Sequence, residues 1–409
     1  MTLLERYEEV VGHQAVLHLR QLADRLQGKR VVHVNSTRTG GGVAEILGWM
    51  IPLLNELGLQ ARWEVISGPP DFSRITKAFH NGIQGMPVTI TPADLALHRD
   101  VCRDNARRLD LSADVVFVHD PQPIYLPEYA PADTAARWVW RCHIDASHPD
   151  PTIWQHLEGA LPRYDATIFS MAAFARQLVK PAFLIAPSID PLSEKNRPLA
   201  DADRLATLER LGIDPGRPLV LQVSRFDRFK DPLGVIEAFR LVKPYYPDLQ
   251  LALVGGSADD DPEGPEVYAD VMRAAGNDPD IKVLMLPPDS HRDINALQRS
   301  AVIVLQKSIR EGFGLTVAEA LWKGVPVIGG ATGGITLQVH DYQTGFLVYS
   351  PAGAAYRIRY LLRYADKRER MGRAGHAFIH DHFLLIRQLR EDLQMLLCLD
   401  RPGSETLVV

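Results

Sequence analysis

Residues 302–320 read Val-Ile-Val-Leu-Gln-Lys-Ser-Ile-Arg-Glu-Gly-Phe-Gly-Leu-Thr-Val-Ala-Glu-Ala. The first four residues are apolar and mostly β-branched, which predicts a buried strand that ends near Leu305. Gly312 and Gly314 predict a tight turn, and we expect a helix to begin at about Leu315. A strand, a glycine turn and a helix in this order direct free helix amides at the turn, which favours a bound phosphate.

The same alternation of apolar strand and helical stretch recurs along most of the chain. Further strands are expected at residues 30–34, 63–66, 114–118, 138–140, 166–169, 219–223, 249–254, 281–284 and 325–328. Helices are expected between them, for example at residues 43–57 and 233–242. Several strands are apolar without alternation, as parallel strands are when helices cover both faces of their sheet. The sequence therefore predicts two doubly wound, Rossmann-like α/β domains, with ligands at the carboxyl ends of the strands, in the cleft between domains.

A polar, proline-marked segment separates the two series of strands. Residues 188–198 read Ser-Ile-Asp-Pro-Leu-Ser-Glu-Lys-Asn-Arg-Pro, which is typical of a linker between domains. We expect a first domain over residues 1–187, a linker with a leading helix over 188–217, and a second domain over 218–383. Residues 354–399 read as consecutive helices without a further strand.

Composition excludes several classes of protein. The 409 residues are 46% hydrophobic and 23% charged, and 45 Lys and Arg against 50 Asp and Glu give a formal net charge of −5. This is a globular composition that lacks the broad positive field of a nucleic-acid-binding protein. No apolar run approaches the ~18–20 residues that cross a membrane, and the charged N-terminus is not a secretory signal. Cys102, Cys142 and Cys398 are too scattered for a disulfide framework, which predicts a cytoplasmic protein.

Charged side chains follow two of the strands expected in the second domain. Arg225 and Lys230 follow the strand that ends at Val223, where two cations can clamp a diphosphate and neutralise a leaving group. Glu311 precedes the glycine turn, and Glu319 lies about one turn inside the next helix, where we expect it to face the cleft. Carboxylates beside a phosphate site suit the hydroxyl groups of a sugar or a ribose. Each residue alone could be a solvated surface charge, but their combination favours a ligand site.

The first expected strand runs into Gly40, Gly41 and Gly42 and then into a helix. Consecutive glycines let the backbone approach a ligand closely, and the start of the helix favours negative charge. The loop is not a Walker A motif, because no Gly-Lys-Ser/Thr follows. It is also an incomplete dinucleotide-binding motif, because Glu45 stands at the third glycine position, although Glu64 lies where a ribose-binding acid would fall. A nicotinamide-dependent oxidoreductase therefore stays open as an alternative.

Histidines mark two strand ends of the first domain. His119 ends one strand and His143 follows another, and two histidines at one sheet edge favour contact with a ligand. His33 lies in the middle of a strand, so we expect it in the core. The spacing of His143, Asp145 and His148 matches no reliable metal-binding pattern, so no metal site is predicted.

Taken together, these motifs resemble the retaining glycosyltransferases of family 4, which have the GT-B fold. In the second domain the resemblance is carried by Ser224-Arg225, Lys230, Glu311-Gly-Phe-Gly with Glu319, and residues 324–328, 333–334 and 341–348. In the first domain, residues 33–47, 118–123, 140–145 and 187–196 are similar to the trehalose-forming members of this family. The resemblance extends over residues 10–395 and implies that the helix at 384–409 crosses back to the first domain.

The resemblance implies how the second domain holds the diphosphate. Arg225 and Lys230 would hold the diphosphate and stabilise it as it leaves. The backbone amides near Phe313, Gly314 and Leu315 would hold its distal phosphate.

The resemblance also assigns the groups that contact hydroxyls. Glu319 would bind the ribose, and Glu311 would bind the glucose that is transferred. His143 would lie at that glucose, beside the reaction centre. The loop Gly40–Gly42 would approach the donor phosphate and the acceptor.

The activity that the resemblance implies is the reversible, configuration-retaining formation of α,α-trehalose from a nucleoside diphosphate glucose (ADP- or UDP-glucose) and free glucose. The leaving diphosphate would itself take the acceptor proton. No cofactor is expected to be required, with Mg²⁺ as an assisting ion at most. A homodimer is compatible with this activity. Neither a nucleic acid nor a membrane is an expected partner. A family member with a different acceptor, of the sucrose- or glucan-synthase type, and a non-catalytic nucleotide-sugar sensor stay open as alternatives.

Overall fold

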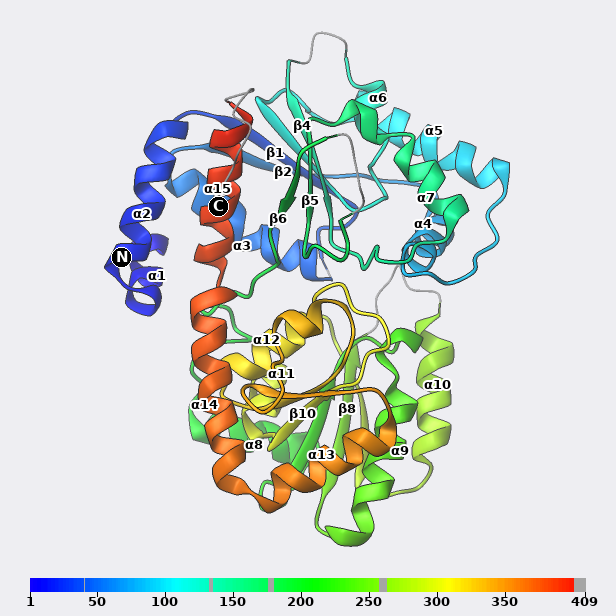
Figure 1. Ribbon diagram of the computed structural model, residues 1–409, viewed down its shortest axis with the longest axis vertical. Helices are drawn as coiled ribbons and strands as arrows, with labels where there is room; N and C mark the ends of the chain where they lie inside the picture. Colours follow the sequence, from blue (N-terminus) through cyan, green and yellow to red (C-terminus); the bar gives the residue numbers. More distant parts are fainter. Residues whose placement is uncertain (40, 132–134, 176–179, 257–262, 401–409) are drawn as a thin grey trace. The chain divides into compact units, whose positions relative to one another are not determined.

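The computed structural model describes residues 1–39, 41–131, 135–175, 180–256 and 263–400. The chain divides into two compact units (Figure 1). Unit 1 comprises Met1–Ser188 and Leu385–Val409, and unit 2 comprises Ile189–Leu384. Each unit contains its own six-stranded parallel sheet, so the prediction of two doubly wound α/β bodies is confirmed.

The sheet of unit 1 has the strand order β2-β1-β3-β4-β5-β6. Its strands are β1 (Arg30–Asn35), β2 (Gln60–Val65), β3 (Val115–His119), β4 (Arg137–Cys142), β5 (Ala166–Phe169) and β6 (Ala182–Leu184). The chain first adds β2 on one side of β1 and then returns to add β3 on the other side. The carboxyl ends of β1 and β3 therefore form the topological switch point, where open α/β sheets bind ligands.

Helices cover both faces of this sheet (Figure 1). Those of unit 1 are α1 (Leu3–Val11), α2 (His13–Ala23), α3 (Gly42–Glu56), α4 (Pro70–Ile83), α5 (Pro92–Arg108), α6 (Leu126–Tyr129), α7 (Pro151–Glu158) and α15 (Leu385–Leu399). The last helix, α15, packs against α2 and α3 although it is remote from them in sequence. The helices α4, α5 and α7 supply side chains to the core on the opposite face.

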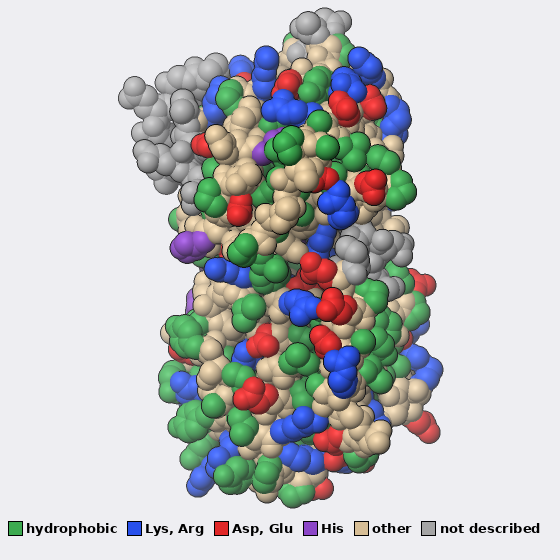
Figure 2. Space-filling model, turned by 90° about the vertical axis from the view of Figure 1, so that its right-hand side faces the viewer, with side chains coloured by type: hydrophobic (Ala, Val, Ile, Leu, Met, Phe, Trp, Pro, Cys, Tyr) green, Lys and Arg blue, Asp and Glu red, His purple; other side chains and the backbone are tan. Residues whose placement is uncertain are grey.

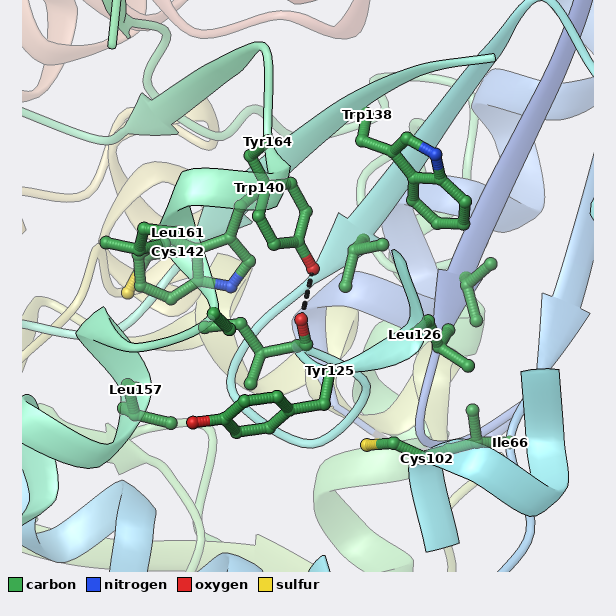
Figure 3. Close-up of a cluster of buried hydrophobic side chains, with 14 of the residues drawn as sticks. Ile66, Cys102, Tyr125, Leu126, Trp138, Trp140, Cys142, Leu157, Leu161 and Tyr164 are labelled. Atoms are coloured by element: carbon green, nitrogen blue, oxygen red, sulfur yellow. Dashed lines mark hydrogen bonds between the residues drawn. The ribbon is translucent and has the colours of Figure 1, made fainter. Parts of the chain in front are cut away.

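The core on the α4, α5 and α7 face is rich in aromatic side chains (Figure 3). Trp138 and Trp140 are two residues apart on β4, so both point into this core. Tyr164 is buried with them, and its hydroxyl donates a 2.6 Å hydrogen bond to the carbonyl oxygen of Ile124. That bond satisfies the polar tip of a buried aromatic side chain. It also ties the segment after β3 to the segment before β5.

The sheet of unit 2 has the strand order β12-β11-β10-β7-β8-β9. Its strands are β7 (Leu219–Val223), β8 (Gln250–Gly256), β9 (Ile281–Leu286), β10 (Ile303–Gln306), β11 (Val327–Gly330) and β12 (Gly345–Val348). Here the chain adds β8 and β9 on one side of β7 and returns to add β10 on the other. The switch point of unit 2 therefore lies at the carboxyl ends of β7 and β10.

Two layers of helices enclose this second sheet. The helices are α8 (Asp201–Arg210), α9 (Pro232–Val242), α10 (Gly264–Ala275), α11 (His291–Ser300), α12 (Leu315–Trp322), α13 (Pro351–Arg363) and α14 (Ala365–His382). Those of one layer, α9, α10 and α13, share a core with the strands, and α13 packs along α9 (Figure 1). In the other layer α11 packs on α8, and α12 packs on α14.

The strands expected from sequence are all present, and two further ones join them. The additions are short edge strands: β6 has three residues, two of them exposed, and β12 begins with Gly345. The expected linker is not loose, since unit 2 includes it from Ile189 onward and buries Asp190, Ser193 and Asn196. The side-chain amide of Asn196 donates to the Asp190 carbonyl at 2.9 Å, which satisfies polar groups that composition alone assigned to solvent.

Surface features agree with the composition. Lys and Arg side chains lie among Asp and Glu side chains on the face shown in Figure 2, so neither sign of charge dominates that view. No helix among the described residues combines the length and the apolar character that crossing a membrane would need.

Candidate active site

The switch point of unit 2 brings together three of the predicted site residues. Arg225 and Lys230 follow β7, and Glu311 follows β10. The two strands are neighbours in register, with Val304 paired to Leu221. Loops that leave the same ends of adjacent parallel strands must lie close to each other.

Lys230 and Glu311 form an ion pair at this edge. The distance from Lys230 Nζ to Glu311 Oε2 is 2.7 Å, and the side chains are 17% and 9% exposed. The hydroxyl of Ser308 donates to the same carboxylate oxygen at 3.2 Å. The buried side chain of Gln222 donates to the Lys230 carbonyl at 2.8 Å, which holds the loop in place. A cation and a carboxylate are thus fixed side by side, as a phosphate next to a sugar would require.

Arg225 is more open than Lys230. Its side chain is 40% exposed, and its guanidinium lies 3.9 Å from the carboxylate of Asp227. Asp227 is buried and accepts a 2.8 Å hydrogen bond from the Phe229 amide, which caps the short turn Arg228–Lys230. Arg225 therefore stands on a constrained loop with an accessible planar cation, a group suited to two-pronged contact with phosphate.

The glycine turn before α12 leaves backbone donors without partners. The N–H groups of Phe313, Gly314 and Leu315 make no hydrogen bond to any described residue. Gly314 has φ +84° and immediately precedes the helix, a conformation that side chains disfavour. The Phe313 side chain is buried against Phe383, so only its backbone is available to a ligand. Three adjacent donors at a helix start are an arrangement that favours a bound anion, and phosphate binding at this turn stays a prediction.

Gly334 packs directly on this turn. Its N–H donates to the Glu311 carbonyl at 3.1 Å. A Cβ atom at Gly334 would lie 2.4 Å from the Cα of Phe313, so only glycine fits there. The Gly333-Gly334 motif therefore has a structural cause, which is to let a second loop support the turn.

Glu319 is not presented as the sequence suggested. It lies on α12 with an exposure of 0%, and its carboxylate is 3.6 Å from Lys195 Nζ. Gln298 donates to the other oxygen at 3.2 Å. Burial raises the pKa of Glu319, but the charges of Lys195 and Lys323 together with hydrogen bonds outweigh burial, and the pKa is lowered overall. The carboxylate is thus ionised inside unit 2, and a contact with ribose stays a prediction.

Lys195 is the functional candidate that sequence reasoning missed. It comes from the segment interpreted as a linker, and the structure places it against Glu319. Its neighbour Asn196 accepts a 2.8 Å hydrogen bond from Lys323, at the end of α12. A cation within a polar, proline-rich stretch was the available signal, but nothing local indicated its partner.

The switch point of unit 1 carries the other predicted residues. Gly41 has φ +81° and precedes α3, which begins at Gly42. Gly40 lies outside the described residues. Val43 in the first turn of α3 and His143 after β4 line the same small hollow. Val43, which directly follows the glycine loop, and His143 therefore lie at one place in unit 1, and contact of the glycines or of His143 with a ligand stays a prediction.

His143 is held by Asp120 in a strained turn. The Asp120 carboxylate accepts a 2.7 Å hydrogen bond from the His143 amide. Asp120 itself has φ +63°, a left-handed conformation that costs energy for a residue with a side chain. Burial raises the pKa of Asp120 to about 7, although this hydrogen bond and the Arg141 charge act in the opposite direction. Strain of this kind is typical of functional sites.

His143 is also the end of a row of hydrogen-bonded rings. Nδ1 of His33 lies 3.0 Å from Nε2 of His119, and Nδ1 of His119 lies 3.0 Å from Nε2 of His143. Burial lowers the pKa of His33 to about 3 and lowers the pKa values of His119 and His143 well below their usual range. All three rings are therefore neutral. His33 is buried as expected, but it is also a hydrogen-bonding partner rather than a simple core residue.

Arg141 lies beside this row and is itself neutralised. It is 2% exposed, and its guanidinium pairs with Asp392 on α15 at 3.1 Å. It also donates to the Ile185 carbonyl at 3.2 Å. Among the described residues no group of His, Cys, Asp and Glu side chains is arranged to hold a metal ion.

Comparison with known proteins identifies a family for each of the two units. Residues 33–176 match the family described as "Trehalose synthase, N-terminal domain", and residues 203–378 match "Glycosyl transferases group 1". The trehalose synthase of Pyrococcus horikoshii is 43% identical over 398 residues, covering 96% of this chain and 95% of the relative. That of Rubrobacter xylanophilus is 41% identical over 399 residues, covering 96% of each.

The solved structures show the fold. The UDP-forming α,α-trehalose-phosphate synthase of Burkholderia xenovorans superimposes with a TM-score of 0.73 at 16% identity, covering 92% of this chain and 100% of that chain. At this identity the likeness concerns the fold alone. It agrees with the two parallel sheets described above, and the GT-B fold class is confirmed.

Proposed function

The chain belongs to the trehalose synthases among the group 1 glycosyltransferases, and on this basis we propose that it transfers glucose from a nucleoside diphosphate glucose to free glucose with retention of configuration. The product is α,α-trehalose, and the transfer is reversible. One observation carries the proposal: a cation and a carboxylate, Lys230 and Glu311, lie 2.7 Å apart beside three backbone donors without described partners. No comparable arrangement would be needed for hydride transfer.

The residues of unit 2 suit departure of a diphosphate. The bond from the glucose C1 to the phosphate oxygen breaks, and negative charge grows on that oxygen. Lys230 and Arg225 neutralise this charge, while the amides at Phe313–Leu315 hold the distal phosphate. The acceptor hydroxyl bonds to C1 on the same face, and its proton passes to the departing phosphate oxygen. Glu311 holds the glucose through its hydroxyls.

The residues of unit 1 suit the uncharged sugar that takes part in the reaction. His143 is a neutral ring at the switch point, so it offers the sugar a hydrogen bond without adding charge. The loop at Gly41 and Gly42 lets the backbone approach closely. The reaction needs no cofactor, and Mg²⁺ would assist only through the phosphates of the substrate. Cys102 and Cys142 are buried free thiols, which suits a reducing cytoplasm.

The test is an incubation with glucose and each of ADP-, UDP- and GDP-glucose, with the product identified by NMR. We expect a non-reducing disaccharide with both anomeric carbons in the α configuration, in equal yield with and without a chelator. An arm with glucose 1-phosphate separates a nucleotide-dependent synthase from a phosphorylase. A reducing disaccharide, or free glucose from donor hydrolysis alone, would refute the proposal.

A further inference from the structure

The row of histidines in unit 1 is built by the register of the sheet. His33 pairs with Phe117, which is two residues before His119. His119 in turn pairs with Arg141, which is two residues before His143. Residues two apart on a strand share a face, so the three rings step diagonally across one face of β1, β3 and β4. Strands hold the first two rings, and rigid elements position side chains more accurately than loops do.

Counting protons along the row leaves only two arrangements. A neutral imidazole has one N–H donor and one acceptor nitrogen. His119 uses both of its nitrogens within the row, so it donates to one neighbour and accepts from the other. The three protons must therefore all point toward His143 or all point toward His33.

The buried end of the row decides between the two arrangements. His33 is 2% exposed, and its Nε2 has no hydrogen-bond partner among the residues described. If the protons pointed toward His33, the terminal N–H would lie at this nearly buried end of the row, whereas His143 at the other end is half-buried and lines the hollow. An unfilled acceptor is tolerated better than an unsatisfied donor, so the protons point toward His143. The remaining nitrogen of His143, Nδ1, likewise has no partner in the described part of the chain.

We infer that His33 and His119 act as positioning residues that fix the proton of His143 on Nδ1, so that His143 presents a hydrogen-bond donor to an oxygen of the bound sugar. Three neutral rings then behave as one unit, and a change in the middle of β1 alters the chemistry offered at the site. The contact with sugar rests on the proposed function. The tautomer itself is a property of the resting protein.

The first test is NMR of ¹⁵N-histidine-labelled protein at pH 7.5 without ligand. Long-range nitrogen–proton correlations distinguish the two tautomers, and single His→Gln variants assign the signals. We expect all three rings to carry the proton on Nδ1. A proton on Nε2 of His143 would overturn the inference, whether or not the protein transfers glucose.

The second test replaces His33, the ring farthest from the site, by two residues that are nearly isosteric with each other. His33→Leu removes the donor, whereas His33→Asn keeps an amide N–H near the position of Nδ1. We expect His33→Leu to lower kcat about tenfold, the effect of one lost hydrogen bond, and to convert His143 into a tautomer mixture. KM for the donor should stay unchanged, because His33 does not touch it. His33→Asn should keep kcat within about twofold on the same reasoning.

Phe117→Leu is the matched control, because Phe117 stacks on His33 at 4.5 Å but carries no nitrogen. It perturbs the packing and should leave kcat and the His143 tautomer unchanged. Equal losses of kcat in the Leu and Asn variants at an unchanged tautomer would show that the row only packs. Absence of glucosyl transfer in the unaltered protein, with the expected tautomers, would refute the proposed function alone.

Discussion

The two switch points have the same backbone design and opposite chemistry. In both units the segment after a strand ends in a glycine with positive φ directly before a helix: Gly41 at +81° precedes α3, and Gly314 at +84° precedes α12. In unit 2 the neighbouring groups are charged, with Lys230 paired to Glu311. In unit 1 they are neutral rings that end in His143.

The difference shows how one topology divides the work of a transfer reaction. Topology determines where a ligand binds, and side chains determine what is done to it. An edge with ionised partners can absorb the charge of a leaving group. An edge of neutral imidazoles can orient hydroxyls without attracting the anion. Each prediction below tests whether the units really differ in this way.

The largest effect should come from acid, and it should fall on unit 1. Burial lowers the pKa of His33 to about 3, and it does the same for His98, which lies on α5 against Phe79 in unit 1. As the pH falls from 7 to 5, these histidines become protonated in the unfolded chain but stay neutral in the folded protein. Each therefore lowers the free energy of unfolding by about 2 kcal/mol. His119 and His143 add losses of the same sign. Asp120, with its pKa raised to about 7, gains a proton in the folded state and returns about 2 kcal/mol. The losses from the four histidines are expected to exceed the gain from Asp120, so acid should destabilise unit 1 overall.

Unit 2 should tolerate the same change of pH. The lowered pKa of Glu319 gives a contribution that persists above the ordinary value of 4.5 and is lost only below it. Hydrogen–deuterium exchange at pH 7, 6 and 5, corrected for intrinsic rates, follows the two units separately. Strands β1, β3 and β4 should lose protection before β7 and β10. Simultaneous loss in both sheets would contradict the division into a neutral and a charged unit.

The next largest effect concerns the buried ion pair of unit 2. Glu319→Gln leaves Lys195 charged and without its carboxylate inside the protein, which should cost about 3–5 kcal/mol of unfolding free energy. Removing both charges, as in Glu319→Gln with Lys195→Met, should recover most of this loss. Urea unfolding followed by exchange in α12 measures both variants.

A parallel variant in unit 1 sharpens the comparison. Asp392→Asn leaves Arg141 unpaired and should destabilise unit 1 while sparing α12. A Glu319→Gln protein of normal stability but weakened affinity for UDP would contradict the structural role. It would support the prediction that Glu319 contacts the ribose.

The third effect concerns the cation beside the leaving group. Lys230→Ala should lower kcat about 10²–10³-fold, because one preorganised charge at the leaving group is lost. Arg228→Ala is the matched control, since Arg228 lies in the same loop but pairs with Glu266 at 2.7 Å on the surface. Steady-state kinetics with the preferred donor compare the two. Equal rates in both variants would mean that the loop charges are only solvated, and the contrast between the units would fail.

The sequence was sufficient for the architecture because hydrophobic periodicity is local. Runs such as Leu219–Val223 are mostly apolar in the sequence itself, so the strands and their parallel packing could be predicted. The edge strand Ala182–Leu184 could not, because only pairing with β5 makes it a strand. The contacts of the segment after Ser188 could not be predicted for the same reason, since its partners Asn295 in α11 and Lys323 at the end of α12 lie 101 and 127 residues away in sequence.

The candidate site was predictable where a motif is contiguous. At Gly312–Leu315 the glycines that predict the turn and the amides that they position lie within four consecutive residues. The partner of Lys195 and the row from His33 to His143 depend on sheet register and on helix packing. No pattern of spacing in the sequence indicates either of these contacts, so they are recognised only in the structure.

The smallest effect distinguishes the anion site from ordinary helix strain. Gly314→Ala places a side chain at φ +84°, which costs about 1–2 kcal/mol, and its Cβ would lie 3.3 Å from Glu311 Cγ. Gly324 at the other end of α12 has φ +75° and no atom within 3.8 Å of such a Cβ, so Gly324→Ala carries similar strain away from the site.

Both variants should therefore lose similar stability in thermal unfolding, but only Gly314→Ala should bind UDP more weakly in calorimetric titration. We expect a loss of about tenfold, since the amides of the turn would no longer converge on the phosphate, each such bond being worth about 1.5 kcal/mol. Gly41→Ala is the counterpart in unit 1, where the loop is expected to approach the donor phosphate; UDP affinity should fall less than in Gly314→Ala if unit 2 supplies the main contacts to the distal phosphate. Weaker UDP binding in Gly324→Ala, or an equal loss in Gly41→Ala, would show that affinity follows helix strain or a phosphate contact shared by both units, and the assignment of anion binding to one switch point would be wrong.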